Sequence, residues 1–199
     1  MKMLPTVSLL AALALTSAAR ADAPFNASLW APDIQAVSAG EDIRGMRLEI
    51  YGRNRNVTGL DLGFGNEVTG DFKGVQIPGI FNNVGGSMTG AQLGVLNFTG
   101  GEVNGAKIGF FNWDRDNAAS FTGASIGLAN IARYTDTTGA QIGMVNCAKH
   151  VRGVQIGFAN FADTLSGVQI GLWNQVNSRS WGTWDPMPRV FPIINIGRW

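Results

Sequence analysis

A short unit is repeated eight times along this chain of 199 residues. It reads Gly, any residue, a polar residue, Leu or Ile, Gly, an apolar residue, any residue, Asn; the copy at 153–160 is GVQIGFAN. Successive copies start 14 to 18 residues apart. A repeat of this length predicts one supersecondary element per copy, which becomes stable by stacking on its neighbours. The units start at Gly59, Gly74, Gly90, Gly105, Gly123, Gly139, Gly153 and Gly167.

Asparagine closes every unit, and the residue before the second glycine position is always Leu or Ile. We interpret the asparagines as structural, pairing amide to amide between stacked units. Residues 45–52 (GMRLEIYG) form a degenerate first unit that lacks the closing Asn. The eight repeat asparagines are Asn66, Asn82, Asn97, Asn112, Asn130, Asn146, Asn160 and Asn174.

Within a unit, the apolar residues alternate with the others. Val154, Ile156 and Phe158 fall on one face of an extended segment, and Gln155 falls on the other, which is strand geometry. From this pattern we expect the Leu/Ile position and the following apolar position to point into the core. The polar third position is then expected to face solvent.

These features predict an all-β fold, a β-solenoid of about eight to nine coils of 14–18 residues with a Pro/Trp-rich C-terminal cap. Each unit would be one coil, with glycines at its sharp corners. An outer-membrane β-barrel is the alternative, and a different antiparallel layout is a third. All units read in the same direction, however, whereas barrel strands alternate in direction.

The N-terminus has the layout of a signal peptide: a basic Lys2, an apolar stretch from Val7 to Leu15, and Ala19-Arg20-Ala21 as the cleavage pattern. We therefore expect an exported protein that resides in the periplasm, at the cell surface or outside the cell. The predicted organisation is a signal peptide (1–21), an N-terminal segment with capping and the degenerate first coil (22–58), the repeat solenoid (59–180) and the C-terminal cap (181–199).

Charge argues against a nucleic-acid partner. The chain has 15 basic and 14 acidic residues, and cleavage after Ala21 removes Lys2 and Arg20, which leaves 13 against 14. Nucleic-acid binding requires a basic patch. The single cysteine, Cys147, forms no internal disulfide and is expected to be buried. One His and one Cys make no zinc site, and we expect no cofactor.

Catalytic candidates are few. Cys147 and His150 could form a nucleophilic pair, but core filler beside an exposed loop histidine is the preferred interpretation. A carbohydrate-active β-helix would need two carboxylates on one face. The acidic residues that could supply them are Asp61, Glu67, Asp71, Asp114 and Asp116, and solvated loop charges are the simpler reading.

The third position of the units is the expected outward column. It offers amide side chains to a repetitive partner such as a glycan, or else keeps sheets from stacking. The candidate binding residues are Gln76, Gln92, Gln141, Gln155 and Gln169. The Trp-rich end, with Trp181, Trp184 and Trp199, is expected to seal the last coil.

Residues 28–199 resemble a family of small exported bacterial surface-repeat proteins with units of the form G-[VL]-Q-[ILW]-G-[LF]-x-N. The lead-in 51–63 (YGRNRNVTGLDLG) and the closing 191–195 (FPIIN) carry the resemblance beyond the repeat itself. The resemblance implies an exported or cell-envelope repeat protein and supplies no catalytic residues. We therefore expect a monomeric, non-enzymatic protein with a structural or binding role and an unidentified envelope or extracellular partner, protein or glycan. A membrane partner is expected only for the barrel alternative.

Overall fold

The computed structural model describes residues 22–115, 120–177 and 190–197, and this part of the chain is built from β-strands without a helix. The strands are β1 (Ala23–Trp30), β2 (Ile34–Gln35), β3 (Ile43–Asn54), β4 (Val57–Val68), β5 (Phe72–Val84), β6 (Met88–Leu93), β7 (Leu96–Thr99), β8 (Val103–Ile108), β9 (Phe111–Asp114), β10 (Ser120–Ile126), β11 (Ala129–Ile142), β12 (Val145–Ile156), β13 (Ala159–Val176) and β14 (Val190–Ile196). The predicted signal peptide lies outside the described residues.

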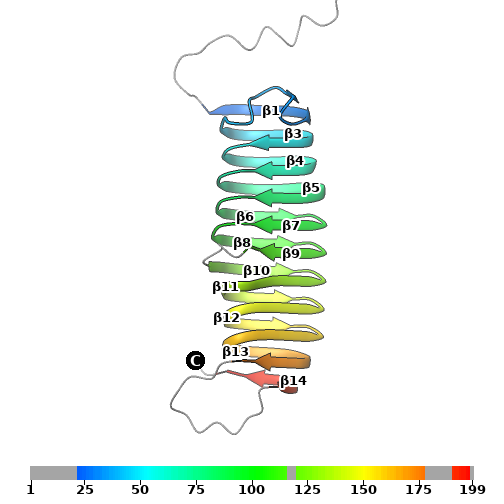
Figure 1. Ribbon diagram of the computed structural model, residues 1–199, viewed down its shortest axis with the longest axis vertical. Coiled ribbons are helices and arrows are strands. Elements are labelled where there is room, and N and C mark those ends of the chain that lie inside the picture. The colour runs from blue at the N-terminus through cyan, green and yellow to red at the C-terminus, as the bar shows by residue number, and fades with distance from the viewer. Residues whose placement is uncertain (1–21, 116–119, 178–189, 198–199) are drawn as a thin grey trace, which may run out of the picture.

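Successive coils pair in parallel and in register, so the predicted β-solenoid is confirmed (Figure 1). Gly139 pairs with Gly153, and Gly153 with Gly167. The degenerate first unit is also a coil, because Gly45 pairs with Gly59. Parallel pairing of consecutive coils excludes the antiparallel arrangement of sequential strands that the two alternative folds required.

Each coil consists of two strand segments that face each other as two layers, joined by a tight turn. In the middle of the rod the layers are separate strands, with β6 and β8 in the first layer and β7 and β9 in the second. In β11 and β12 one long strand runs from the second layer of one coil into the first layer of the next, whereas β3, β4 and β5 each cover both layers of a single coil.

The first glycine of each unit is required by both backbone and space. Gly153 has φ of 140°, and a Cβ there would lie 2.0 Å from the carbonyl oxygen of Gly139 in the preceding coil. A side chain is therefore excluded both by the left-handed backbone and by the stacked neighbour. The same geometry recurs down the stack, which explains why this position never varies among the units.

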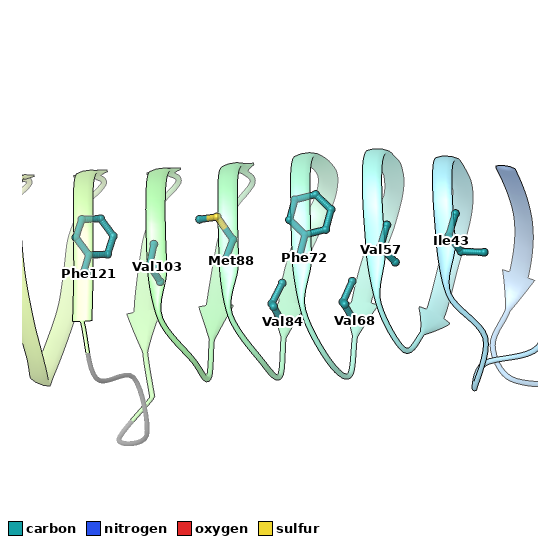
Figure 2. Close-up of a cluster of buried hydrophobic side chains, with 8 residues drawn as sticks. All are labelled: Ile43, Val57, Val68, Phe72, Val84, Met88, Val103 and Phe121. Atoms are coloured by element: carbon teal, nitrogen blue, oxygen red, sulfur yellow. The ribbon is translucent and has the colours of Figure 1, made fainter. Parts of the chain in front are cut away.

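The apolar core is a narrow column between the two layers. Figure 2 shows its N-terminal part, which includes Ile43, Phe72, Met88 and Phe121, each at most 1% exposed. Its C-terminal part uses smaller side chains, such as Ala132 and Ala148. The first-layer members lie two residues before the first glycine of their unit, a position that the sequence interpretation did not assign to the core.

The predicted inward direction of the Leu/Ile position is wrong. Ile156 is 40% exposed and Phe158 is 58% exposed, whereas Gln155 is fully buried. Val151 and Gln155 lie four residues apart and therefore point to the same side of the strand. Burying Val151 consequently buries Gln155 and turns Ile156 outward.

Both ends of the stack carry strands that differ from the repeat. At the N-terminal end, within the segment 22–58 that we expected to include the cap, β1 stacks in parallel on β3 and is paired by the short antiparallel β2. At the C-terminal end, β14 pairs with β13 in the antiparallel direction. Residues 178–189, 198 and 199, which include Trp181, Trp184 and Trp199, lie outside the described residues.

Candidate binding surface

The turn that joins the two layers of each coil carries two columns of apolar side chains. We call these columns the apolar edge. The first comprises Leu48, Leu62, Ile77, Leu93, Ile108, Ile126, Ile142, Ile156 and Ile170; the second comprises Ile50, Phe64, Ile80, Val95, Phe110, Leu128, Met144, Phe158 and Leu172. Leu62 and Leu93 are half-buried, and the other members are 39–63% exposed.

The apolar edge runs the length of the rod, along the side at which β6 turns into β7 in Figure 1. Neither column contains a polar residue. The apolar surface continues onto both layers: Val75 is exposed on the first, and Phe111 and Trp173 are exposed on the second. Monomeric soluble proteins rarely expose a continuous apolar patch of this extent, so the apolar edge is the candidate interaction surface.

Backbone polar groups at the apolar edge are hydrogen-bonded between coils. The amide of Leu128 donates to the carbonyl of Phe110 at 2.9 Å, and the amide of Gly127 donates to the carbonyl of Ile142 at 2.9 Å. The same bonds recur in the neighbouring turns; for example, the amide of Gly157 donates to the carbonyl of Ile170. The turns therefore satisfy much of their own hydrogen bonding without water.

Exposed basic side chains lie on both layers, three to five residues along the strand from the apolar edge. On the first layer they are Arg44, Lys73 and Arg152; on the second they are Arg53, Arg115, Arg133 and Lys149. The acidic residues in the same rows, Glu67 and Asp163, are half-buried.

The opposite edge of the rod is acidic. There, one column contains Asp42, Asp71, Glu102 and Asp136, with His150 one coil further. The basic side chains therefore lie between the apolar surface and the acidic far edge: Arg44 and Lys73 line the same groove as Asp42 and Asp71, and Arg55 pairs with Asp42 at 2.7 Å.

The five glutamines predicted to bind a partner are interior residues, and that prediction is wrong. Gln76, Gln92, Gln155 and Gln169 are fully buried, and Gln141 is 1% exposed. They bond to one another along the stack: the Nε2 of Gln169 donates to Gln155 at 2.8 Å, and the Nε2 of Gln155 donates to Gln141 at 2.7 Å. The Nε2 of Gln141 donates to the carbonyl of Cys147 in the facing layer, and the other four glutamine amides donate toward the N-terminal end of the rod.

The asparagine ladder is confirmed and continuous. Each Nδ2 donates to the Oδ1 of the asparagine in the next coil, at 2.7–3.3 Å from Asn66 to Asn174. These amides donate toward the C-terminal end, opposite to the glutamines. The same Nδ2 group also caps the turn; in Asn146 it donates to the carbonyl of Ile156 at 2.9 Å. The asparagines thus hold the backbone of the apolar edge from inside.

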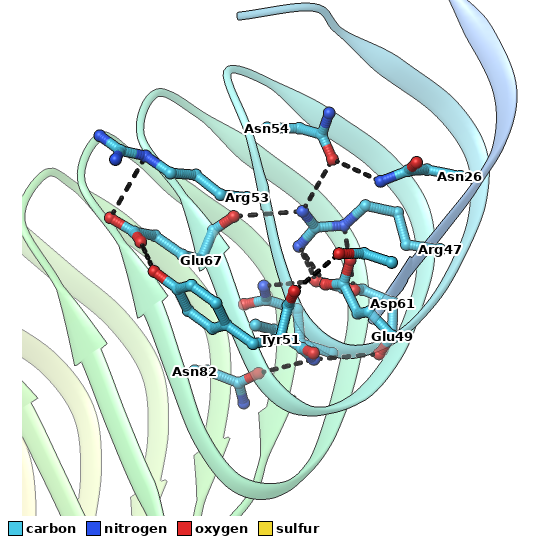
Figure 3. A network of polar contacts seen from close by, with 12 residues as sticks. Asn26, Arg47, Glu49, Tyr51, Arg53, Asn54, Asp61, Glu67 and Asn82 are labelled. Carbon is cyan, nitrogen blue, oxygen red and sulfur yellow. Dashed lines mark hydrogen bonds and ion pairs between the residues drawn. The ribbon is translucent and has the colours of Figure 1, made fainter. Parts of the chain in front are cut away.

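A buried charge cluster fills the interior of the N-terminal coils (Figure 3). The guanidinium of Arg47 binds Asp61, with Nε to Oδ1 at 3.1 Å, and lies 3.1 Å from Glu49. It also donates to Asn54 and to the carbonyl of Glu67. Burial, reinforced by the nearby charge of Asp61, raises the pKa of Glu49 to about 9 despite Arg47.

Tyr51 and Glu67 extend this cluster toward the surface. The hydroxyl of Tyr51 donates to the carboxylate of Glu67, which Arg53 approaches to 3.8 Å. Partial burial and the hydrogen bond to Glu67 raise the pKa of Tyr51 to about 12. Within this cluster the buried Asp61 faces inward, whereas we expected the polar third position of the unit to face solvent.

A second buried ion pair lies in the middle of the rod. Lys107 occupies the glutamine column, is fully buried, and donates to Asp114 of the facing layer. Burial lowers the pKa of Lys107. Lys107 and its neighbour Ser125 interrupt the glutamine contacts, because Ser125 bonds instead to Asn130.

Cys147 and His150 lie at the surface of the second layer and the far edge. Cys147 is half-buried, and burial raises the pKa of its thiol, which disfavours the thiolate. The Nδ1 of His150 instead contacts the hydroxyl of Thr164 at 2.6 Å. A shallow groove of about 460 Å³ beside Cys147 is lined by Arg133, Tyr134 and Phe161 among others.

The candidate carboxylates do not come together as an exposed pair. Asp61 is buried beneath Arg47, Asp114 is bound to Lys107, and Asp71 lies on the far edge; Asp116 lies outside the described residues. In the described ranges, no group of three or more His, Cys, Asp or Glu side chains is arranged to hold a metal ion.

No protein-family model, curated protein or solved structure matches this chain. Among the described residues, no helix has the length and apolar character needed to cross a membrane.

Sequence reasoning missed the apolar edge as a surface because it assigned those side chains to the core. A signal for the correct direction is present in the sequence. The residue two positions before the first glycine is Val57, Phe72, Met88, Val103 or Phe121 in the first five units, and it shares a strand face with the polar third position. If the polar third position faced solvent, this apolar position on the same strand face would also face solvent, and a second apolar column would be exposed.

Proposed function

We propose that this chain is a non-enzymatic, exported repeat protein with a structural or binding role in the bacterial cell envelope or outside the cell, and that it binds through the apolar edge. One observation carries the proposal: two columns of side chains along the whole rod contain only Leu, Ile, Val, Phe and Met, and most are exposed. Other positions fill the core, so apolar residues that recur on the outside of every unit are explained by recognition of a partner.

Export is the other part of the proposal. It is supported by the signal-peptide pattern of residues 1–21 and by the resemblance of the units to exported surface-repeat proteins. The alternative of a carbohydrate-active β-helix loses its main support, because Asp61 is enclosed and ion-paired.

The proposal is tested in cells by fractionation of a bacterium that expresses the chain. We expect the protein in the envelope or the medium, shortened at its N-terminus. Phe110→Ser with Phe158→Ser should lower its retention by its binding partner while circular dichroism shows an unchanged β fold, because both rings are exposed. A protein that stays in the cytoplasm, or whose distribution is indifferent to these substitutions, would contradict the proposal.

A further inference from the structure

We propose that the partner of the apolar edge is the surface of a lipid bilayer that contains anionic lipids, with the rod lying flat and its apolar edge inserted below the headgroups. This inference rests on the proposed binding role of the apolar edge and names the partner.

The shape of the apolar surface favours a bilayer over a second copy of the chain. The apolar edge lies on a turn, and the apolar surface continues onto both layers, through Val75 on one side and Phe111 and Trp173 on the other. A second rod packed against one layer would leave the other layer uncovered. A bilayer surrounds an inserted edge from both sides.

The backbone of the apolar edge is already suited to an apolar environment. Unpaired backbone groups cannot be placed in lipid without a large cost. Here the turn amides of Gly127, Leu128 and Ala129 all donate to carbonyls of adjacent coils, and the amide of Asn112 caps the carbonyl of Ile126 from inside. Insertion of these turns into lipid would therefore leave few backbone groups without a hydrogen-bond partner.

The charges at the border complement an anionic surface. Lys73 and Arg152 on the first layer, and Arg133 and Lys149 on the second, are exposed and lie between the apolar surface and the acidic far edge, at the height of the headgroups when the apolar edge is inserted. The acidic side chains of Asp71, Glu102 and Asp136 project from the far edge instead. An amphipathic element with basic flanks gains both apolar burial and electrostatic attraction at an anionic interface.

The dimensions also fit. With coils spaced by about 4.8 Å, the eight units and the degenerate first unit give an apolar edge roughly 40 Å long. Interfacial elements bury their apolar face about 5–10 Å deep, which is the depth of one side-chain column and the turn behind it. The long axis would lie in the plane of the membrane.

The test is sedimentation of purified protein with two kinds of vesicle, phosphatidylcholine alone and phosphatidylcholine mixed with phosphatidylglycerol. All variants carry the same N-terminus. Phe110→Ser combined with Phe158→Ser should weaken binding to the mixed vesicles at least roughly tenfold, because two exposed rings no longer insert. Tyr134→Ser is the matched control: Tyr134 is as exposed as Phe110, at 53%, but lies beyond the basic border, and its loss should leave binding unchanged.

A second pair of variants tests the charges. Lys73→Gln combined with Arg152→Gln should weaken binding to the anionic vesicles by roughly fivefold for each charge removed and leave binding to neutral vesicles unchanged. Glu102→Gln, on the far edge, should not weaken either. Added salt should reduce the difference between the two kinds of vesicle.

Three results would overturn the inference. One is absence of vesicle binding by a folded protein. Another is binding that the ring variants do not change. The third is a dimer in sedimentation equilibrium that Phe158→Ser dissociates, without vesicle binding, which would make a second copy the occupant. If vesicle binding fails but the ring variants still release the protein from its cellular partner, the partner is a protein, and the proposed binding role stands without the lipid.

Discussion

The two halves of the solenoid solve the same packing problem with different chemistry. In the N-terminal coils the polar interior contains the ions Arg47, Asp61, Lys107 and Asp114, and the apolar column contains large side chains such as Phe72. In the coils from residue 136 to 177 the interior polar groups are amides and hydroxyls, and the apolar column has shrunk to alanine, valine and leucine.

This difference separates what the fold needs from what it tolerates. The asparagine ladder and the glycine column are the same in both halves, so they define the coil. The glutamine column accepts an ion only where a counter-charge lies beside it: Asp114 of the facing layer for Lys107, and Asp61 of the next coil together with Glu49 for Arg47. A buried charge is tolerated when paired and becomes strongly destabilising when its partner is removed.

The largest effect is expected from removing both carboxylates around Arg47. Glu49→Gln with Asp61→Asn should lower the free energy of unfolding by about 3–5 kcal/mol, because a buried guanidinium loses its counter-charge. Urea titration followed by circular dichroism measures the loss. Asp61→Asn alone should cost less, since Glu49, 3.1 Å from Arg47, can then carry the negative charge. Equal losses in the single and double variants would show that Glu49 does not compensate.

A comparable loss is expected in the middle of the rod. Lys107→Gln restores the residue of the other coils but leaves Asp114 buried without its cation, which should cost about 3–5 kcal/mol. Adding Asp114→Ala, the residue found at this position in three later coils, should recover most of that loss. Urea titration of the single and double variants measures how much of the lost free energy of unfolding the second substitution restores. If the double variant is no more stable than the single one, the ion pair is not what this coil depends on.

The pH dependence of stability should differ between the halves. The pKa of Glu49 is raised from 4.5 to about 9 in the folded protein, so the folded state holds a proton that the unfolded state releases. Its contribution is fully present below pH 4.5 and is lost as the pH rises toward about 9. Hydrogen exchange resolved along the chain should show the N-terminal coils opening more readily at pH 8 than at pH 5.

Glu49→Gln is the matched variant for this effect, since a neutral amide replaces the carboxyl. It should flatten the pH response of the N-terminal coils and leave that of the coils from 136 to 177 as it was. If the pH dependence of hydrogen exchange in the N-terminal coils is the same in Glu49→Gln as in the unsubstituted protein, a group other than Glu49 controls that dependence.

The smallest effect is expected in the amide half. Gln155→Met removes a donor to Gln141 and an acceptor for Gln169 while keeping a similar volume, which should cost about 1–3 kcal/mol. Thermal unfolding measures it against Ser166→Ala, a half-buried position on the outside of β13 that should change little. A cost as large as that of the ionic variants would remove the distinction between the halves.

The architecture could be read from the sequence, whereas the direction of its side chains could not. Regular spacing of Gly59 to Gly167 predicts stacked coils, and the asparagine ladder follows from an asparagine that never varies. Alternation of period two says that Gln155 and Ile156 face opposite sides, but it does not say which side is inside. The rule that apolar residues are buried then selected the wrong one.

The rule failed because the interior can be polar when its amides bond to identical amides one coil away. Gln155 meets Gln141 and Gln169 only after stacking, so no local pattern reveals that its hydrogen bonds are satisfied. The partners of Arg47 and Lys107 were likewise unpredictable, because Asp61 and Asp114 reach them from another coil and from the facing layer. The apolar edge can be recognised as a surface only once the glutamines are known to face inward and the Leu/Ile positions outward.

The opposite directions of the two amide ladders bear on how long such a rod can be. Asparagine amides donate toward the C-terminal end and glutamine amides toward the N-terminal end. Aligned dipoles in a single column add up, as they do in a helix. In the coils from 136 to 177, where both columns are present, the two antiparallel columns oppose each other, so extending this part of the stack by another such coil builds up little field at its end. The amide dipoles then set no limit on the number of such coils. Duplication or loss of a unit can change the length of the rod without changing the field at its ends.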